Sequence, residues 1–95
     1  MIKHLILLIS TTILLSFQAE GKWVRFSVDM TGQTINPNGV HLTGNFQELA
    51  GFTGGDWNPA TITMAPVSGG NLFFVTVKIP AFQKYEYKIV NGDQF

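Results

Sequence analysis

Apolar and polar residues alternate along most of the chain beyond its first 20 residues. In 22–30 the apolar side chains occupy every second position from Val24 to Met30. Because successive side chains of a strand point to opposite faces, this pattern predicts a strand with one buried face. Clusters of Gly, Pro and Asn interrupt the alternation and mark turns. Together these signals predict strands at 22–30, 40–43, 61–65, 72–79 and 85–90.

The alternation also predicts which side chains face the core. The inward positions are Val24, Phe26, Val28, Met30, Val40, Leu42, Phe73, Val75, Val77, Ile79, Tyr85, Tyr87 and Ile89. His41 falls on the outward face of its strand, so we expect a solvated side chain there. The stretch 44–58 is irregular and rich in glycine, and we expect one short turn of helix near 47–50.

Short strands separated by turns every eight to twelve residues or so are typical of antiparallel sandwiches and barrels. The chain stops at Phe95, directly after the turn signal at 91–93, where a returning strand is expected. We therefore expect one all-β domain over 21–95, an antiparallel β-sandwich that lacks its C-terminal strand or strands.

Residues 1–20 have the pattern of a cleavable secretory signal peptide. Lys3 gives a positive start, and 5–15 is almost entirely apolar. This apolar run is shorter than the roughly 20 residues that a membrane-spanning helix needs. Small residues around Ala19 and Gly21 suit a cleavage site. The alternative is an uncleaved N-terminal anchor. We expect a secreted protein: extracellular, periplasmic or on the cell surface.

Composition excludes several classes of partner and site. The chain is formally neutral, whereas binding to nucleic acid or to an anionic membrane surface requires a basic patch. It has no cysteine, so it contains neither a disulfide framework nor a thiolate zinc site. About 75 residues remain after signal removal, and a domain of that size buries only roughly 60% of its unfolded surface. Neighbouring domains of a longer protein are therefore expected partners as well.

The sequence carries no motif for catalysis. Gly-x-Ser-x-Gly is absent, and His41 is the one histidine beyond the signal. Asp56 and Glu86 are candidate carboxylates for glycoside hydrolysis, but Glu86 alternates with inward tyrosines and is expected on a solvated face. The pair Asn91 and Asp93 is too small a set for calcium and suits a turn. We expect no enzyme activity, no catalytic residue, no metal and no cofactor.

Two tryptophans do not fit the inward pattern. Trp57 lies in a loop between Asp56 and Asn58, and Trp23 begins the first predicted strand on its outward face. An exposed aromatic ring can pack on the apolar face of a sugar while polar groups bond the hydroxyl rim. The alternative for Trp57 is a cap over the open end of the core, and for Trp23 a cover for the sheet or a contact with a neighbouring domain.

Three segments carry a resemblance to a known family. The segments 40–46, 72–80 and 85–95 contain Gly-Asn-Phe, a strand ending in Ile-Pro, and Tyr-Glu-Tyr-Lys followed by Gly92. In this order and spacing they resemble the glycogen- and starch-binding modules of branching enzymes, amylolytic enzymes and the AMP-activated kinase β subunit. The likeness covers about 24–95 and is closest to versions in secreted bacterial proteins.

The resemblance implies an immunoglobulin-like β-sandwich that binds α-glucan without catalysis. It places Trp57 as the ring that stacks on glucose and Lys88 as a donor to sugar hydroxyls. A second stacking tryptophan of the family falls on Phe95, whose smaller ring has no N–H group. The alternative function is a structural spacer or protein-interaction domain of a larger exported protein, without a sugar site.

Overall fold

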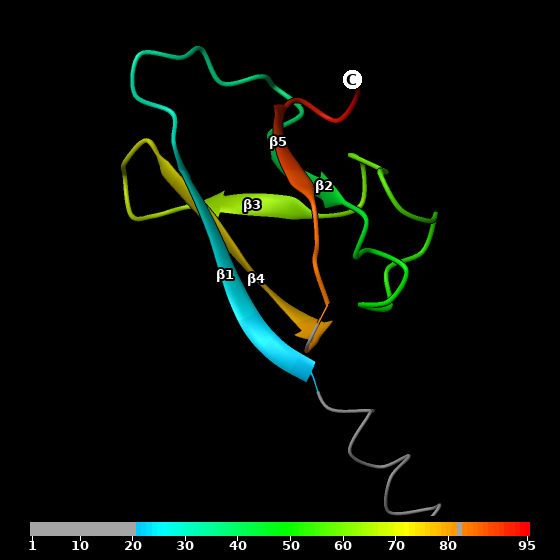
Figure 1. Cartoon of the computed structure of the whole chain (residues 1–95). Helices are drawn as coiled ribbons and strands as arrows, with labels where there is room; N and C mark the ends of the chain where they lie inside the picture. Colours follow the sequence, from blue (N-terminus) through cyan, green and yellow to red (C-terminus); the bar gives the residue numbers. More distant parts are fainter. Residues whose placement is uncertain (1–20, 82) are drawn as a thin grey trace, which may run out of the picture.

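The computed structural model describes residues 21–81 and 83–95, and this part of the chain forms an all-β structure without a helix. Its strands are β1 (Gly21–Asp29), β2 (Val40–Gly44), β3 (Thr63–Pro66), β4 (Leu72–Pro80) and β5 (Tyr87–Asn91), shown in Figure 1. Each of the five predicted strands is confirmed, with ends shifted by one or two residues. The predicted signal peptide, 1–20, lies outside the described residues. Within them, no helix is long and apolar enough to cross a membrane.

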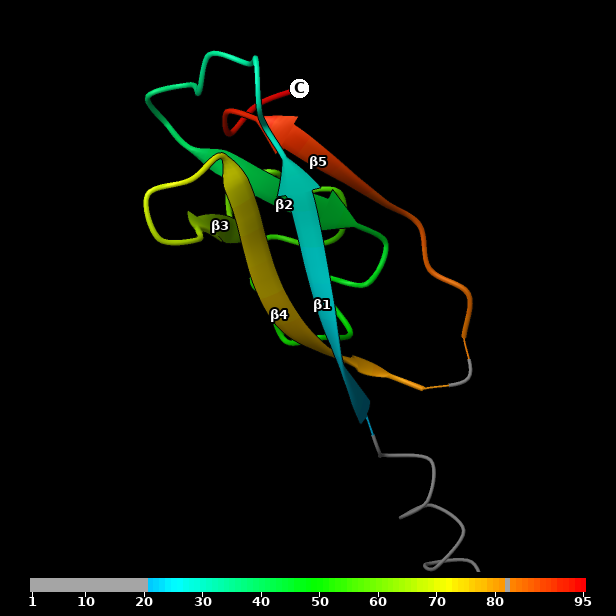
Figure 2. The same ribbon diagram turned by 90° about the vertical axis from the view of Figure 1, so that its left-hand side faces the viewer.

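The strands form one curled antiparallel sheet in the order β1-β4-β3-β2-β5. The short strand β3 makes the curl, because its first half pairs with β2 and its second half with β4: Met64 lies opposite Val40, and Ala65 lies opposite Phe74. In Figure 2, β1 and β4 consequently cross in front of β2. The fold is thus a two-layered, sandwich-like sheet.

The core lies between these two layers. Its buried apolar side chains are Met30, Val40, Leu42, Phe46, Ile62, Met64, Phe73, Val77 and Ile79. The inward face predicted for β4 is confirmed, since Phe73, Val77 and Ile79 are all buried. Burying a side chain of this size stabilises the fold by about 1.5–3 kcal/mol relative to leaving it exposed.

The two outer strands of the sheet, β1 and β5, meet through aromatic rings instead of hydrogen bonds. Phe26 of β1 lies edge-on to Tyr87 of β5, with ring centroids 5.0 Å apart, and stacks on Phe46 at 5.5 Å. Tyr87 nevertheless leaves 55% of its surface exposed, and Val24 is also exposed. The prediction that these two side chains are buried is therefore wrong, because each lies on a strand with no neighbour on one side.

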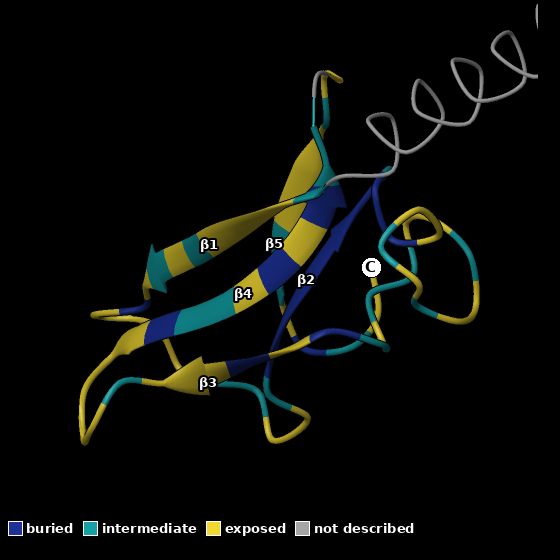
Figure 3. Cartoon of the chain, turned by 90° about the horizontal axis from the view of Figure 1, so that it is seen from below, coloured by how far each residue is buried: buried dark blue, intermediate teal, exposed yellow. Residues whose placement is uncertain are grey.

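The strand β2, which lies between β3 and β5, is buried on both of its faces, as the dark blue ribbon in Figure 3 shows. The prediction of a solvated His41 is wrong: only 4% of this residue is exposed. Its Nδ1 lies 2.7 Å from the Gly92 carbonyl oxygen and donates to it, because a carbonyl can only accept. Its Nε2 lies 3.3 Å from the Thr63 hydroxyl. His41 therefore joins β2 to β3 and to the turn after β5.

Replacing this histidine by an apolar residue tests its structural role. His41→Leu should lower the free energy of unfolding by about 1–3 kcal/mol, because the carbonyl of the buried Gly92 and the hydroxyl of the exposed Thr63 both lose their hydrogen-bond partner. Urea denaturation followed by tryptophan fluorescence measures the change. Thr63→Val removes only the longer hydrogen bond, between the Thr63 hydroxyl and His41 Nε2, and should lower the free energy of unfolding by less. Equal stability of His41→Leu and the parent would contradict the bridging role.

Candidate functional site

The loop between β2 and β3 folds back against the end of β2. A hydrogen bond of 2.9 Å from the Ala50 N–H to the Phe46 carbonyl closes a single turn where the short helical turn is predicted. The loop then reverses through Gly54 and Gly55, both at positive φ, and reaches Trp57. Glycine adopts this conformation without steric cost, which explains the glycine-rich sequence.

The side chain of Gln47 fastens this loop to β2, and it is fully buried. Its Oε1 accepts hydrogen bonds from the Thr43 hydroxyl (2.8 Å), the Gly44 N–H (3.1 Å) and the Asn58 N–H (3.0 Å). Its Nε2 donates to the Asn58 carbonyl (2.8 Å) and the Thr61 hydroxyl (2.9 Å). The Gln47 amide therefore binds both backbone groups of Asn58, its N–H and its carbonyl. Asn58 is the residue directly after Trp57.

Sequence reasoning missed Gln47. Polar side chains in glycine-rich loops are usually solvated, and no spacing in the sequence marks this one as buried. The structure explains the burial, because the described part of the chain leaves no buried side-chain nitrogen or oxygen without a hydrogen-bond partner. An amide that uses both its oxygen and its nitrogen in this way can be buried without a net penalty.

Other Asp and Asn side chains also accept hydrogen bonds from backbone N–H groups. Asp56 accepts a bond of 2.9 Å from the Glu48 N–H, and Asn58 accepts one of 3.0 Å from the Ala60 N–H. Asn91 accepts from the Asn36 N–H at 2.8 Å. The Asn58 contact is an Asx turn. The contacts of Asp56 and Asn91 join residues 8 and 55 positions apart in the chain and so tie different segments together.

Trp57 is held in a backbone conformation that L-residues rarely adopt. Its φ is +57°, and it is the one non-glycine residue with positive φ in the described chain. This left-handed conformation costs roughly 1–2 kcal/mol for a residue with a Cβ. A hydrogen bond of 3.1 Å from the Trp57 N–H to the Gly44 carbonyl, together with the bonds of Gln47 to Asn58, holds it there.

The Trp57 side chain is 38% exposed. Among the described residues, none of the ring-to-ring contacts involves it, neither with Phe46 nor with Phe52. The ring is thus partly covered and partly open to solvent.

Lys88 is exposed and lies on β5 directly opposite Thr43 of β2. Directly opposite residues of an antiparallel pair project from the same face, with Cβ atoms about 5 Å apart. Thr43 in turn contacts Gln47, which holds Asn58 beside Trp57. Lys88 and Trp57 are therefore both fixed to the Thr43–Gly44 end of β2.

Phe95 belongs to the opposite end of β2. The turn that precedes it is tied to the start of that strand, because the Gly92 N–H donates to the Gly39 carbonyl at 2.7 Å and Asp93 accepts from the Asn38 amide at 3.2 Å. Phe95 is 74% exposed. No hydrogen bond or ring contact within the described residues joins it to Trp57 or Lys88.

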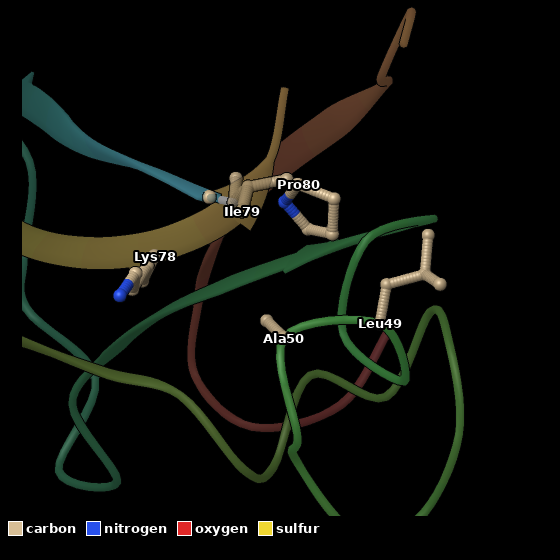
Figure 4. Close-up of a pocket in the computed structure, with 6 residues that line it drawn as sticks. Leu49, Ala50, Lys78, Ile79 and Pro80 are labelled. Atoms are coloured by element: carbon tan, nitrogen blue, oxygen red, sulfur yellow. The ribbon is translucent and has the colours of Figure 1, made fainter. Parts of the chain in front are cut away.

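A pocket of about 210 Å³ lies elsewhere, between the end of β4 and the turn after Phe46. It is lined by Gly21, Leu49, Ala50, Lys78, Ile79 and Pro80, and Figure 4 shows Leu49 and Ala50 beside the end of β4. This lining includes none of the three expected sugar-binding residues. Trp57, Lys88 and Phe95 therefore lie outside this pocket.

No protein-family model, curated protein or solved structure matches this chain.

The role of Gln47 can be tested by removing its amide. Gln47→Leu should lower the free energy of unfolding by about 3 kcal/mol, because buried N–H, C=O and hydroxyl groups lose their partners. Chemical denaturation measures this change. The matched control is Gln33→Leu at an exposed position, which should change stability by no more than about 0.5 kcal/mol. A loss in Gln47→Leu no larger than that of the control would show that the amide does not anchor the loop.

Proposed function

We propose that this chain is a secreted, non-catalytic module that binds α-glucan, a starch- or glycogen-like polysaccharide. Trp57 is the stacking ring, Lys88 donates to sugar hydroxyls, and Phe95 is a second, more distant ring for a longer glucan. The observation that carries the proposal is the backbone of Trp57, a bulky residue held at positive φ with its ring partly exposed.

The strained backbone at Trp57 points to a role for the tryptophan side chain, because other residue types would adopt the same backbone without strain. Glycine or asparagine adopts the left-handed conformation readily, and the loop already uses glycine at Gly54 and Gly55. Strained residues persist where the surrounding structure enforces them, and they cluster at binding sites. Keeping tryptophan at this position therefore favours a function for the ring itself.

Lys88 supports the same proposal through its place beside the loop. A stacking ring gives affinity for the apolar face of a sugar, and a charged donor nearby fixes the orientation of the hydroxyls. Both residues are fastened to Thr43 and Gly44, so their separation is set by the rigid strand β2. Sites built on such elements are more precise than sites on free loops.

We also propose that this sandwich-like sheet is an immunoglobulin-like sandwich. The Tyr85 hydroxyl donates to the Pro80 carbonyl at 2.7 Å. A tyrosine that bonds back to the backbone a few residues upstream, at the corner between two strands, is a hallmark of that fold. The passage of the chain from β4 in one layer to β5 in the other agrees with this assignment.

The alternative, a structural spacer or interaction domain of a larger exported protein, is favoured by one observation. Trp57 is more covered than exposed, so its ring also contributes to packing. Under this alternative the ring caps the loop, and its removal destabilises the fold.

Trp57→Asn separates the two functions. If the ring binds sugar, this variant should be as stable as the parent or more stable by up to about 1 kcal/mol, because asparagine tolerates the left-handed backbone. It should also lose glycogen retardation in affinity electrophoresis. Chemical denaturation and gels with and without glycogen are run on the same samples, with Lys88→Gln as a second binding variant.

The opposite pattern would support the spacer. A destabilised Trp57→Asn with no retardation of the folded parent would show that the ring is a packing element and that α-glucan is not the ligand. Retardation that persists in a folded Trp57→Asn would place the sugar site elsewhere on the molecule.

A further inference from the structure

The outer face of the β1–β4 layer is uncovered in the described chain. Its side chains form cross-strand rows, because Trp23 lies opposite Lys78, Arg25 opposite Thr76, Ser27 opposite Phe74, and Asp29 opposite Leu72. Seven of these eight residues are exposed, and Phe74 is half-buried. In Figure 3, β1 is accordingly drawn in yellow and teal along its length.

Trp23 is the most exposed tryptophan of the structure, at 69%. Of the two alternatives expected for this residue, a cover for the sheet does not agree with so open a position, whereas a contact with a neighbouring domain would leave Trp23 exposed in this chain alone. Lys78 projects from the same face directly beside it, with Cβ atoms about 5 Å apart. The face therefore presents an exposed aromatic ring on β1 and, directly opposite it on β4, a lysine whose side chain extends past Gly21.

Arg25 supplies a second cation on this face, and its position is fixed. Its guanidinium carbon lies 4.3 Å from the centre of the Phe74 ring. This cation–π contact draws Arg25 toward the Phe74 row and away from Trp23. A guanidinium that lies flat on a ring keeps its N–H groups free at the edge, where they can bind a carboxylate in bidentate fashion.

Arg25 and Lys78 lie toward one end of the face, and the carboxylate of Asp29 lies at the other. Asp29 ends β1, and its Oδ1 accepts from the Thr31 hydroxyl at 2.6 Å and from the Thr31 N–H at 3.0 Å. These bonds lower the pKa of Asp29 below its ordinary value, because they favour the ionised carboxylate. On this face the two cations, Arg25 and Lys78, therefore lie toward the Trp23 end, and Asp29 lies at the other.

The spacing of the apolar groups argues against a protein partner. Protein interfaces have a contiguous apolar core inside a polar rim. Here the exposed apolar side chains, Trp23 and Leu72, stand at opposite ends of the face, three rows apart. The one ring between them, Phe74, is half-buried and lies under the Arg25 guanidinium. Successive rows are about 7 Å apart, so the exposed apolar side chains do not form one contiguous core. A long, thin, polar ligand therefore fits this face better than a protein does.

We propose that the outer face of β1 and β4 binds an acidic polysaccharide built of uronic acids. One sugar stacks on Trp23 with its carboxylate on Lys78, and a later sugar along the chain places its carboxylate on Arg25. This site is separate from the α-glucan site proposed at Trp57, because the two lie in different layers of the sheet.

The test is isothermal titration calorimetry of the chain expressed from its full 95-residue sequence, with oligogalacturonate as the ligand. We expect binding that weakens with added salt, because carboxylate–cation pairs are screened. Trp23→Ala should weaken it about tenfold or more, the effect of losing one stacked ring. Arg25→Gln and Lys78→Gln should each weaken it and reduce its dependence on salt. Thermal melting by circular dichroism checks that each variant is folded.

Matched controls separate this site from the α-glucan site. Trp57→Asn should leave oligogalacturonate binding unchanged, and Trp23→Ala should leave glycogen retardation unchanged. If glycogen binding fails while oligogalacturonate binds through Trp23, the inference stands and the α-glucan proposal falls. A maltooligosaccharide of equal length should not bind at Trp23.

Three results would overturn the inference. The first is no binding of oligogalacturonate by the folded parent, and the second is equal binding by the parent and Trp23→Ala. The third is binding of dextran sulfate or polyglutamate as tight as that of oligogalacturonate, which would indicate charge attraction or an acidic peptide instead of a uronate chain.

Discussion

The side-chain amide of Gln47 joins the end of β2 to the loop that carries Trp57, and the geometry of the candidate site depends on it. Its bonds to both backbone groups of Asn58 hold the Trp57 turn against β2, together with the bond from the Trp57 N–H to the Gly44 carbonyl. The hydrogen bonds of a buried amide are directional, and their loss inside the protein is costly. An apolar core could fill the same space but could not impose a left-handed backbone on a tryptophan.

The strands of this protein were predictable from sequence because alternation and turn residues are local signals. The errors arise where burial depends on distant neighbours. His41 is buried because β2 lies in the middle of a curled sheet, with β3 and β5 on its two sides. Tyr87 is exposed for the reverse reason, since β5 ends the sheet. A one-dimensional pattern assigns faces to a strand but does not contain its position in the strand order.

The candidate site was predictable only in part. The sequence pointed to Trp57 as an unusual loop aromatic and, through a family resemblance, to Lys88 and Phe95. It gave no sign of Gln47, whose partners lie on β2 and more than ten residues farther along the β2–β3 loop, nor of the positive φ of Trp57. Such features follow from tertiary contacts that override local preferences. The relation between Lys88 and Trp57 also became visible only through the register of β2 against β5.

The register of β1 imposes an order on folding. Gly21 pairs with Pro80, so the first strand to be synthesised finds its only hydrogen-bonded neighbour near the other end of the described chain. Pairings between such distant segments give a high contact order, and domains dominated by them fold in milliseconds to seconds instead of microseconds. Until β4 is complete, β1 remains an unpaired strand with exposed backbone groups, open to pairing with other chains. The same long-range pairing that completes the sheet thus makes the nascent chain dependent on protection from aggregation while it folds.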